Sequence, residues 1–336
     1  MPRIAINGFG RIGRMTFKAG FGQPGFEVVA VNDLTDAKTL AHLLKHDSTY
    51  RAWDKKVSHD DKNLIVEGKK IPVFAVKETE QLPWSEYKVD IVLECTGRFT
   101  NLEGASGHLK AGARRVIISA PAKGGGVPTH VFGVNEKGAG VKSEVINNAS
   151  CTTNCIAPVA AIMQEQFGIK KAMMTTVHSY TADQNLQDGP HKDLRRARAA
   201  ATNIVPTTTG AAIATTETIP ALKNLFDGIS VRVPTACVSL ADFTFLLKRK
   251  TTVQEINKVF KAAAKSARFK NILEVTEEDL VSGDFVGNPA SAIVDLPFTN
   301  VVDGDLVKVL AWYDNEWGYS CRLVEMALLV GKTLKV

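Results

Sequence analysis

The sequence predicts an α/β protein of two domains, the first with a parallel sheet and the second, an α+β domain, with a mainly antiparallel sheet. The chain has 336 residues, more than most single domains of about 100–200 residues. Strand-like runs in the first half are almost continuously apolar, which is typical of parallel strands covered on both faces. Those of the second half alternate between apolar and polar residues. Since the change comes near residue 150, we expect domains over 1–150 and 151–315.

The first domain begins with a strand–helix–strand unit. Arg3–Asn7 and Glu27–Asn32 are the expected strands, and Arg14–Ala19 is the helix between them. The later apolar segments predict a strand, a helix and a strand at 89–94, 105–111 and 115–119.

The second half begins with a predicted helix at Cys151. Ser150 is its expected N-terminal cap and Gly168 lies just beyond its end, whereas Pro158 argues against a straight helix. A polar, arginine-rich segment over 179–209 is predicted to be a long loop. Alternating strands are expected at 172–177, 229–233, 237–247 and 306–313, and a final helix at 322–330.

Composition narrows the class of partner. Lysine and arginine total 41 against 35 aspartate and glutamate residues, a formal net charge of +6. Because these charges are dispersed, they favour an anionic small substrate, or no charged partner at all, over nucleic acid or a membrane surface. Five cysteines without a signal-like N-terminus indicate reduced thiols in the cytoplasm. The cysteines and histidines lack the spacing of metal ligands, so we expect no metal site. No apolar run is long enough to span a membrane.

A glycine-rich turn joins the first strand to the first helix. Gly8, Gly10 and Gly13 have the spacing of the dinucleotide fingerprint, in which a tight turn brings a helix N-terminus to a pyrophosphate. A chance glycine turn is the simpler reading of these three residues alone. However, Asp33 ends the second strand, where a carboxylate binds ribose hydroxyls and repels a 2′-phosphate. The whole pattern predicts a Rossmann-type domain that binds NAD rather than NADP.

Cys151 and His178 are the candidate catalytic pair. At a helix start the thiolate is favoured, so we expect a Cys151 pKa below the ordinary value, with Ser150 and Thr152 able to stabilise an oxyanion. His178 follows an apolar strand and could act as general base. The alternatives are a buried core thiol and a satisfied histidine at a strand end, and spacing alone favours the latter for His178.

Candidate anion-binding residues lie within about 50 positions of one another. They are Thr181, Asp183, Arg195, Arg196, Arg198, Thr207, Thr208, Thr209, Gly210 and Arg232. The guanidinium fork suits phosphate, although an ordinary solvated loop explains Arg195 and Arg198 equally well. Arg232 stands in an apolar run, where an unpaired charge is costly, so we expect an anion or a carboxylate beside it.

These strings together resemble the phosphorylating glyceraldehyde-3-phosphate dehydrogenases, NAD-dependent and of bacterial type. The resemblance spans nearly the whole chain and is carried by INGFGRIGR (6–14), VVAVNDLTD (28–36), NNASCTTNC (147–155), TTVHSYT (175–181), PTTTGAA (206–212), VRVPT (231–235) and WYDNEWGYS (312–320). It implies a cytoplasmic homotetramer of glycolysis and glucose metabolism with one NAD per subunit. It also implies that a C-terminal helix over about 316–336 packs back on the NAD-binding domain.

The resemblance also implies roles for individual residues. The expected cofactor contacts are Gly8, Gly10, Arg11, Ile12, Asp33, Lys77 (where the family more often has arginine), Thr96, Ser119 and Asn315, with Phe99 nearby. The substrate phosphate is expected at Thr181 and Arg232, near Asp183. The attacking phosphate is expected at Ser150, Thr152, Thr209 and Gly210, with Arg196 serving one or both sites.

The implied reaction is oxidation of D-glyceraldehyde 3-phosphate to 1,3-bisphosphoglycerate. In this hypothesis Cys151 forms a hemithioacetal, hydride passes to NAD while His178 takes the hydroxyl proton, and inorganic phosphate cleaves the thioester. The same chemistry on erythrose 4-phosphate is the nearest alternative. A nucleic-acid-binding protein and a non-catalytic dinucleotide sensor are the others; low net charge argues against the first, and the Cys151 and His178 strings against the second.

Overall fold

The computed structural model describes residues 1–334, which form two compact units. The first comprises Met1–His130, Lys137–Ala149 and the described residues from Ser320 onward. The second comprises Val131–Glu136 and Ser150–Tyr319. The segment 131–136 therefore interrupts the range expected for the first domain. Residues 335 and 336 of the expected C-terminal helix lie outside the described residues.

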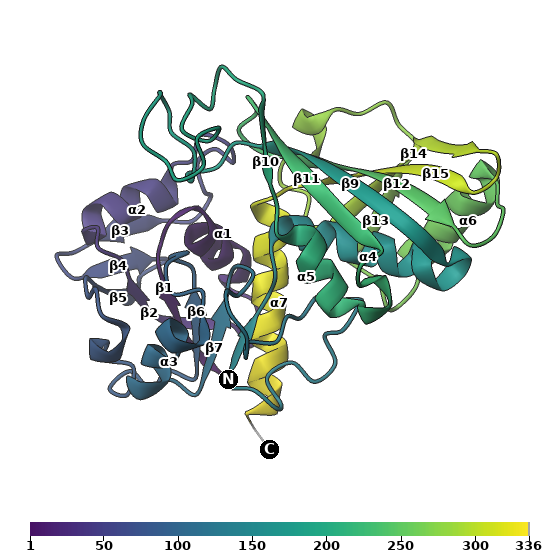
Figure 1. Ribbon diagram of the computed structural model, residues 1–336. Coiled ribbons are helices and arrows are strands. Elements are labelled where there is room, and N and C mark those ends of the chain that lie inside the picture. The colour runs from purple at the N-terminus through teal and green to yellow at the C-terminus, as the bar shows by residue number, and fades with distance from the viewer. Residues whose placement is uncertain (335–336) are drawn as a thin grey trace. The chain divides into compact units, whose positions relative to one another are not determined.

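The first unit contains an eight-stranded sheet in the order β3-β4-β5-β2-β1-β6-β7-β8 (Figure 1). The strands are β1 (Arg3–Asn7), β2 (Glu27–Asn32), β3 (Val57–His59), β4 (Asn63–Val66), β5 (Lys69–Phe74), β6 (Ile91–Glu94), β7 (Arg115–Ile118) and β8 (Val145–Asn147). All neighbours from β5 to β8 in this order pair in parallel, and only β3, β4 and β5 pair antiparallel. The predicted parallel sheet is confirmed, and the outer hairpin was not predicted.

Helices connect these strands and bring the end of the chain back to the first unit. They are α1 (Arg11–Gly20), α2 (Ala37–Lys45), α3 (Leu102–Lys110), the 3₁₀ helix η1 (Thr79–Gln81) and α7 (Trp317–Thr333). Within α7, Leu328 lies so close to Gly25, and Gly331 so close to Pro2, that a Cβ at either glycine would fall within 3.2 Å of its neighbour. The second half of α7 therefore packs against the N-terminal part of the chain.

The second unit contains a seven-stranded sheet in the order β10-β11-β9-β12-β15-β14-β13. The strands are β9 (Ile169–Ser179), β10 (Val205–Thr208), β11 (Phe226–Val233), β12 (Ser239–Leu247), β13 (Leu273–Thr276), β14 (Ala292–Val302) and β15 (Leu306–Tyr313). Two neighbouring pairs, β9 with β11 and β13 with β14, are parallel and the other four are antiparallel. The prediction of a mainly antiparallel sheet is confirmed.

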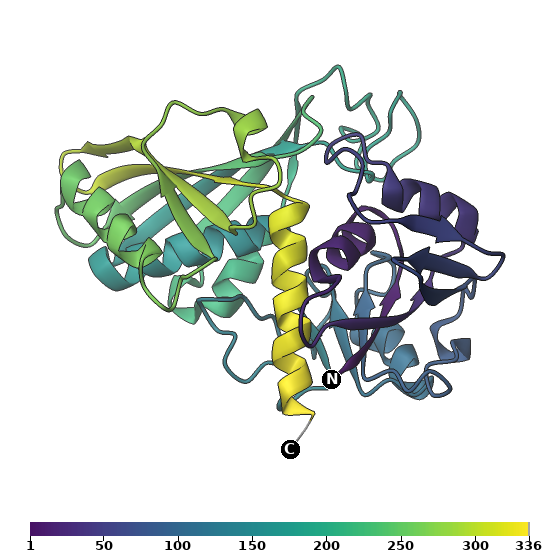
Figure 2. The same cartoon turned by 180° about the vertical axis from the view of Figure 1, so that it is seen from behind.

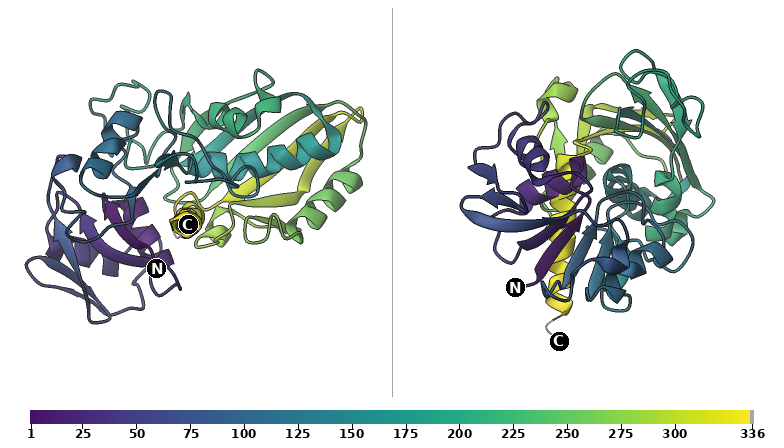
Figure 3. Two further views of the ribbon diagram at one scale, coloured as in Figure 1. Left: turned by 90° about the horizontal axis from the view of Figure 1, so that it is seen from below. Right: turned by 90° about the vertical axis from the view of Figure 1, so that its left-hand side faces the viewer.

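Helices of the second unit pack against this sheet. They are α4 (Cys151–Phe167), α5 (Ala211–Thr218), α6 (Val253–Ala264) and the 3₁₀ helices η2 (Pro220–Leu222) and η3 (Ser282–Phe285). Figure 3 (left) shows α4, in teal, lying along the sheet, where it contacts β9, β12, β14 and β15. Figure 2 shows α6 at the edge formed by β13 and β14. Alternate residues of β12, among them Phe243, Phe245 and Leu247, are fully buried in this core.

The start and end of α4 follow the sequence closely. The Ser150 hydroxyl accepts a hydrogen bond from the Thr153 backbone N–H at 3.0 Å, and Gly168 ends the helix with φ +68°. The helix continues through Pro158. The loop expected over 179–209 contains one strand, β10, whose four residues alternate between buried and exposed.

None of the helices in the described part of the chain is long and apolar enough to cross a membrane.

Gly13 lies where no side chain fits, so a single added methyl group should destabilise the fold. A Cβ at Gly13 would overlap the carbonyl oxygen of Gly8, whereas a Cβ at Gly10 would meet open space. Gly13→Ala should lower the free energy of unfolding in urea by about 1–3 kcal/mol. Gly10→Ala is the matched control and should change it by less than about 0.5 kcal/mol. Equal losses in the two variants would contradict the packing described.

Candidate active site

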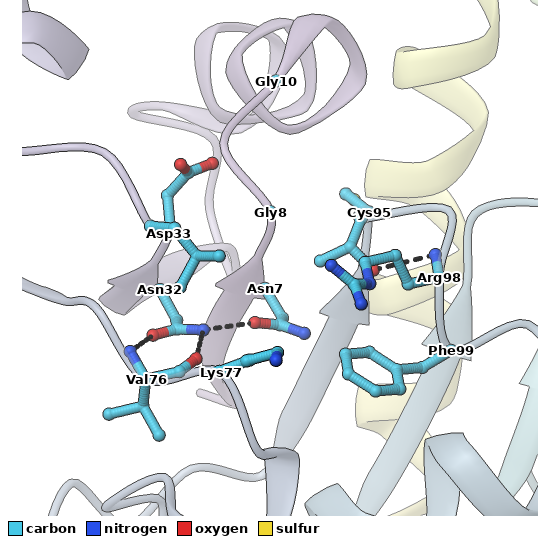
Figure 4. Close-up of a pocket in the computed structure, with 12 residues that line it drawn as sticks. Asn7, Gly8, Gly10, Asn32, Asp33, Val76, Lys77, Cys95, Arg98 and Phe99 are labelled. Carbon is cyan, nitrogen blue, oxygen red and sulfur yellow. Dashed lines mark hydrogen bonds between the residues drawn. The ribbon is translucent and has the colours of Figure 1, made fainter. Parts of the chain in front are cut away.

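A pocket lies at the carboxyl ends of β1, β2 and β6 in the first unit (Figure 4). This is the edge at which parallel sheets bind ligands. The pocket has a volume of about 260 Å³. Its walls are formed by Asn7, Gly8, Gly10, Asn32, Asp33, Leu34, Val76, Lys77, Cys95, Thr96, Arg98 and Phe99.

The glycine turn allows the backbone to come close to the pocket. Gly8 has φ +90°, and a Cβ there would lie 2.7 Å from the Thr96 nitrogen, so only glycine fits. Gly10 precedes α1, has open space around it, and caps the helix without a side-chain hydrogen bond. The first N–H groups of α1 are therefore not covered by a capping side chain, as binding of a pyrophosphate requires.

Asp33 is held in place at the end of β2. One carboxylate oxygen accepts a hydrogen bond from the Phe9 backbone N–H at 2.7 Å, and the other accepts one from the Thr35 N–H at 3.0 Å. Each oxygen keeps a further lone pair for a hydroxyl group. The carboxylate at the pocket wall therefore suits ribose hydroxyls and would repel an added phosphate, which fits NAD.

The predicted cofactor residues do not all line this pocket. Gly8, Gly10, Asp33, Lys77 and Thr96 do. The Arg11 guanidinium instead pairs with Asp47 at 2.5 Å, and Asn315, in the second unit, accepts a hydrogen bond from the Ser239 hydroxyl at 2.9 Å. Ile12 in α1 and Ser119 just after β7 are not among the lining residues.

The polar floor of this pocket was not predicted from the sequence. Asn7 and Asn32 line it, yet neither belongs to the fingerprint. The available signal was that each of these residues, like Glu94, is the last residue of an apolar strand. Cys95 also lines the pocket.

A second cluster, in the second unit, brings Cys151 and His178 together. Cys151 is the first residue of α4, and His178 is the penultimate residue of β9. The Cys151 Sγ lies 3.5 Å from Nε2 of His178, and 4.0 Å from the Thr152 hydroxyl. This contact joins two residues predicted from separate motifs.

Strand pairing places Arg232 beside this pair. In the parallel register of β11 with β9, Arg232 is opposite His178. The Arg232 Nη1 donates to the Thr181 hydroxyl at 3.1 Å and to the Ser179 carbonyl at 3.3 Å. Its Nε is buried without a hydrogen-bond partner. A mostly buried guanidinium that meets only neutral acceptors is suited to binding an anion.

The hydrogen bonds of His178 determine which ring nitrogen carries a proton. Its Nδ1 lies 2.6 Å from the Ser179 carbonyl oxygen, which can only accept. Nδ1 therefore donates, and the neutral ring presents the lone pair of Nε2 to the sulfur of Cys151. Arg232 Nη1, which also lies 3.2 Å from Nδ1, adds positive charge near the imidazole.

Burial sets the acidity of both groups. It lowers the pKa of His178 to about 3, assisted by the positive charge of Arg232. Burial also raises the pKa of the Cys151 thiol, and this outweighs the opposing effects of Arg232 and of hydrogen bonds at Thr152. The expectation of a Cys151 pKa below its ordinary value is therefore wrong. Desolvation disfavours both charged forms, so the pair is a neutral thiol and a neutral imidazole.

Tyr313 is a further residue of this cluster. Its hydroxyl lies 2.9 Å from the Thr152 hydroxyl and 2.8 Å from the Thr176 hydroxyl, and its ring meets that of His178 edge-on at 6.0 Å. Tyr313 therefore fixes Thr152 beside the thiol. Sequence analysis missed this role, although Tyr313 lies within the string at 312–320.

The remaining predicted anion residues form a separate group of contacts. The Arg196 guanidinium pairs with Asp183 at 2.5 Å and donates to the Thr207 hydroxyl and the Thr208 carbonyl. These contacts attach the arginine-rich loop to β10. Thr209 and Gly210 lie at the start of α5, where the Thr209 hydroxyl accepts from the Ala211 N–H at 3.2 Å. Outside both groups, the Cys237 thiol donates to the Asp314 carboxylate at 3.1 Å.

Comparison with known proteins gives matches to both halves of the chain. Residues 2–102 match the family model of the glyceraldehyde 3-phosphate dehydrogenase NAD binding domain, and residues 150–315 match that of the C-terminal domain. The chain is 54% identical over 329 residues to a glyceraldehyde-3-phosphate dehydrogenase of Geobacillus stearothermophilus, covering 98% of each protein. It is 50% identical over 334 residues to one of Zymomonas mobilis, covering 99% of each.

The charge of Arg232 predicts the pH dependence of Cys151 alkylation. Because the guanidinium opposes the effect of burial, Arg232→Met should raise the pKa of the thiol further and shift the iodoacetamide reaction of Cys151 to higher pH. The rate is followed by mass spectrometry of the peptide that contains Cys151. Arg198→Met removes an exposed guanidinium paired with Asp188 and should leave the profile unchanged. An unchanged or more acidic profile for Arg232→Met would contradict the described electrostatics.

Proposed function

Since this chain belongs to the glyceraldehyde-3-phosphate dehydrogenase family, we propose that Cys151 is its nucleophile and His178 its general base. The chain is an NAD-dependent oxidoreductase of glycolysis that converts D-glyceraldehyde 3-phosphate and inorganic phosphate to 1,3-bisphosphoglycerate. The observation that carries the proposed roles is the contact of the Cys151 sulfur with the unprotonated Nε2 of His178.

The neutral pair suits both proton transfers of the reaction. As the sulfur attacks the aldehyde carbon, its proton moves to Nε2 of His178 and then to the carbonyl oxygen, giving a hemithioacetal. In the oxidation, Nε2 takes that hydroxyl proton again. Both transfers require a lone pair on Nε2, which the hydrogen bond from Nδ1 to the Ser179 carbonyl provides. Inorganic phosphate then attacks the thioester carbon and releases the sulfur.

The pocket of the first unit fits NAD, which when bound supplies the hydride acceptor. We assign the pyrophosphate to Gly8, Gly10 and the start of α1, and the ribose hydroxyls to Asp33. Lys77 and Thr96 line the same pocket. The resemblance adds Arg11, Ile12, Ser119 and Asn315.

Two anion sites complete the proposal. We assign the substrate phosphate to Thr181 and Arg232, with Asp183 nearby, because the Arg232 Nε is buried without a partner. An anion there would offset the charge that lowers the pKa of His178, making Nε2 a stronger base when substrate is present. The attacking phosphate is assigned to Ser150, Thr152, Thr209 and Gly210, and Arg196 to one or both sites.

The domain roles and the assembly are part of the same proposal. We assign NAD binding to residues 1–150 with the C-terminal helix, and catalysis to residues 151–315. A cytoplasmic homotetramer is proposed from the family resemblance, and five cysteines without a disulfide suit a reducing compartment. The relatives reported above are named for the three-carbon substrate, which favours glyceraldehyde 3-phosphate over erythrose 4-phosphate as the substrate of this chain.

The catalytic assignment predicts which variants lose activity. NADH formation from glyceraldehyde 3-phosphate should depend on inorganic phosphate, and Cys151→Ser should abolish it because serine is the weaker nucleophile. His178→Asn should lower kcat by about 10²–10⁴-fold. Cys321→Ala, which removes a thiol outside the cluster, is the control and should keep full activity. Phosphate-dependent turnover by Cys151→Ser would refute the assignment of the nucleophile.

The carboxylate of Asp33 predicts cofactor choice. Asp33→Gly should weaken NAD binding and improve the relative kcat/KM for NADP, because the charge that repels a 2′-phosphate is removed. The ratio of kcat/KM for the two cofactors is measured in the wild type and the variant. Asp36→Gly, which alters an exposed carboxylate that caps α2, is the control. An unchanged ratio in Asp33→Gly counts against the assigned role.

A further inference from the structure

A continuous line of hydrogen bonds runs beneath the nucleotide pocket of the first unit. In the sheet register Asn7 is opposite Asn32 on one side and Glu94 on the other, so the last residues of three adjacent strands stand in a row. The side chains of all three are buried, with at most 5% exposed. His108, from α3, and Trp84 extend the row and are fully buried. The proposed catalytic chemistry uses none of these five residues.

Trp84 fixes the directions of the hydrogen bonds that join His108 to Trp84 and to Glu94. Its indole N–H can only donate, and it donates to Nδ1 of His108 at 3.0 Å. The proton of the neutral imidazole therefore lies on Nε2, 3.0 Å from one carboxylate oxygen of Glu94. A histidine in the opposite tautomer would direct an N–H at the indole and a lone pair at the carboxylate.

The Glu94 carboxylate connects His108 to both walls of the pocket by hydrogen bonds. The oxygen that faces His108 also accepts from the Asn7 amide at 2.6 Å. The other oxygen accepts from the Thr96 backbone N–H at 2.8 Å and from the Thr96 hydroxyl. The carboxylate thus meets four donors and fixes the backbone of the Thr96 loop.

The opposite wall is reached through the two asparagine amides. The Asn7 oxygen accepts from the Asn32 amide at 2.7 Å, which fixes the orientation of both groups. The Asn32 amide then bonds the N–H and the carbonyl of Val76, each at 2.9 Å (Figure 4). Val76 and its neighbour Lys77 line the pocket.

His108 also supports the pocket by packing. Its ring meets that of Phe99 edge-on at 6.4 Å, and Phe99 lines the wall on the side of Thr96. His108 therefore contacts Phe99 directly and is connected through Glu94 to Asn7 and Thr96.

We propose that Trp84 and His108 are positioning residues for NAD binding, acting through Glu94 on the two walls that hold the nucleotide. The inference rests on the proposed assignment of this pocket to NAD. Neither residue is among those that line the pocket, so each acts on the nucleotide only through others. Loss of their hydrogen bonds releases the Asn7 amide and the Thr96 loop, which lowers the affinity for NAD and leaves the chemistry at Cys151 unaffected.

The test compares three variants by calorimetric NAD binding and by steady-state kinetics of the full-length enzyme. Trp84→Phe removes the indole N–H and keeps an aromatic ring. His108→Leu removes both hydrogen bonds, whereas His108→Gln retains an acceptor and a donor. We expect the Kd and the KM for NAD to rise about tenfold in Trp84→Phe and more in His108→Leu, with partial recovery in His108→Gln. The kcat at saturating NAD should stay within about twofold of the wild type.

A matched control separates positioning from general destabilisation. Val66→Ala truncates a fully buried side chain in β4, outside the row, and should lower the free energy of unfolding with an unchanged KM for NAD. The inference is overturned if Trp84→Phe and His108→Leu bind NAD as the wild type does, or if Val66→Ala raises the KM equally. If His108→Leu does not fold, Trp84→Phe and His108→Gln decide the question.

A further variant distinguishes failure of this inference from failure of the proposed function. Asp33→Ala alters the pocket wall itself and should weaken NAD binding in any case. If it does so while Trp84→Phe and both His108 variants bind normally, only the positioning role is wrong. If Asp33→Ala also binds NAD normally, the assignment of the pocket is wrong, and the positioning inference falls with it.

Discussion

The short hydrogen bond from Nδ1 of His178 to the Ser179 carbonyl determines what the second unit can do. Because this bond uses the ring proton, the other nitrogen meets the Cys151 sulfur as an acceptor. The bond depends on the backbone at the end of β9, which the neighbouring β11 holds in parallel register. The sheet therefore fixes the tautomer of the base as well as its position.

The same register brings a buried positive charge to the base, and this has two opposing effects. Arg232 helps to lower the pKa of His178, which opposes its protonation, and also favours the thiolate of Cys151. Burial favours the neutral form of both side chains, and for the Cys151 thiol it outweighs the effect of Arg232. A site with this balance keeps its sulfur protonated and uncharged, and a protonated thiol is less easily oxidised than a thiolate.

Sequence patterns predicted the features that depend on neighbouring residues. The cap and the end of α4, the glycine turn at Gly8 and Gly10 and the strands β1 and β2 are of this kind. Features that depend on residues far apart in the chain were not predicted. Tyr313 meets Thr152 across 161 positions in the chain, and Asn7 meets Glu94 across 87, so no local pattern marks either contact.

The error in the Cys151 pKa has the same origin, because the apolar surroundings that bury the thiol come from elsewhere in the fold. The strands β3 and β10 were missed because both are short. In addition, β3 is mostly exposed, and β10 alternates between buried and exposed residues.

The packing of α7 against Pro2 and Gly25 has a consequence for how this protein is made. The first unit takes its earliest strand and one of its helices from opposite ends of the chain. Because α7 follows the second unit in the sequence, the nascent first unit lacks that helix while the second unit is being synthesised. The first unit can therefore be completed only after the second unit has been synthesised.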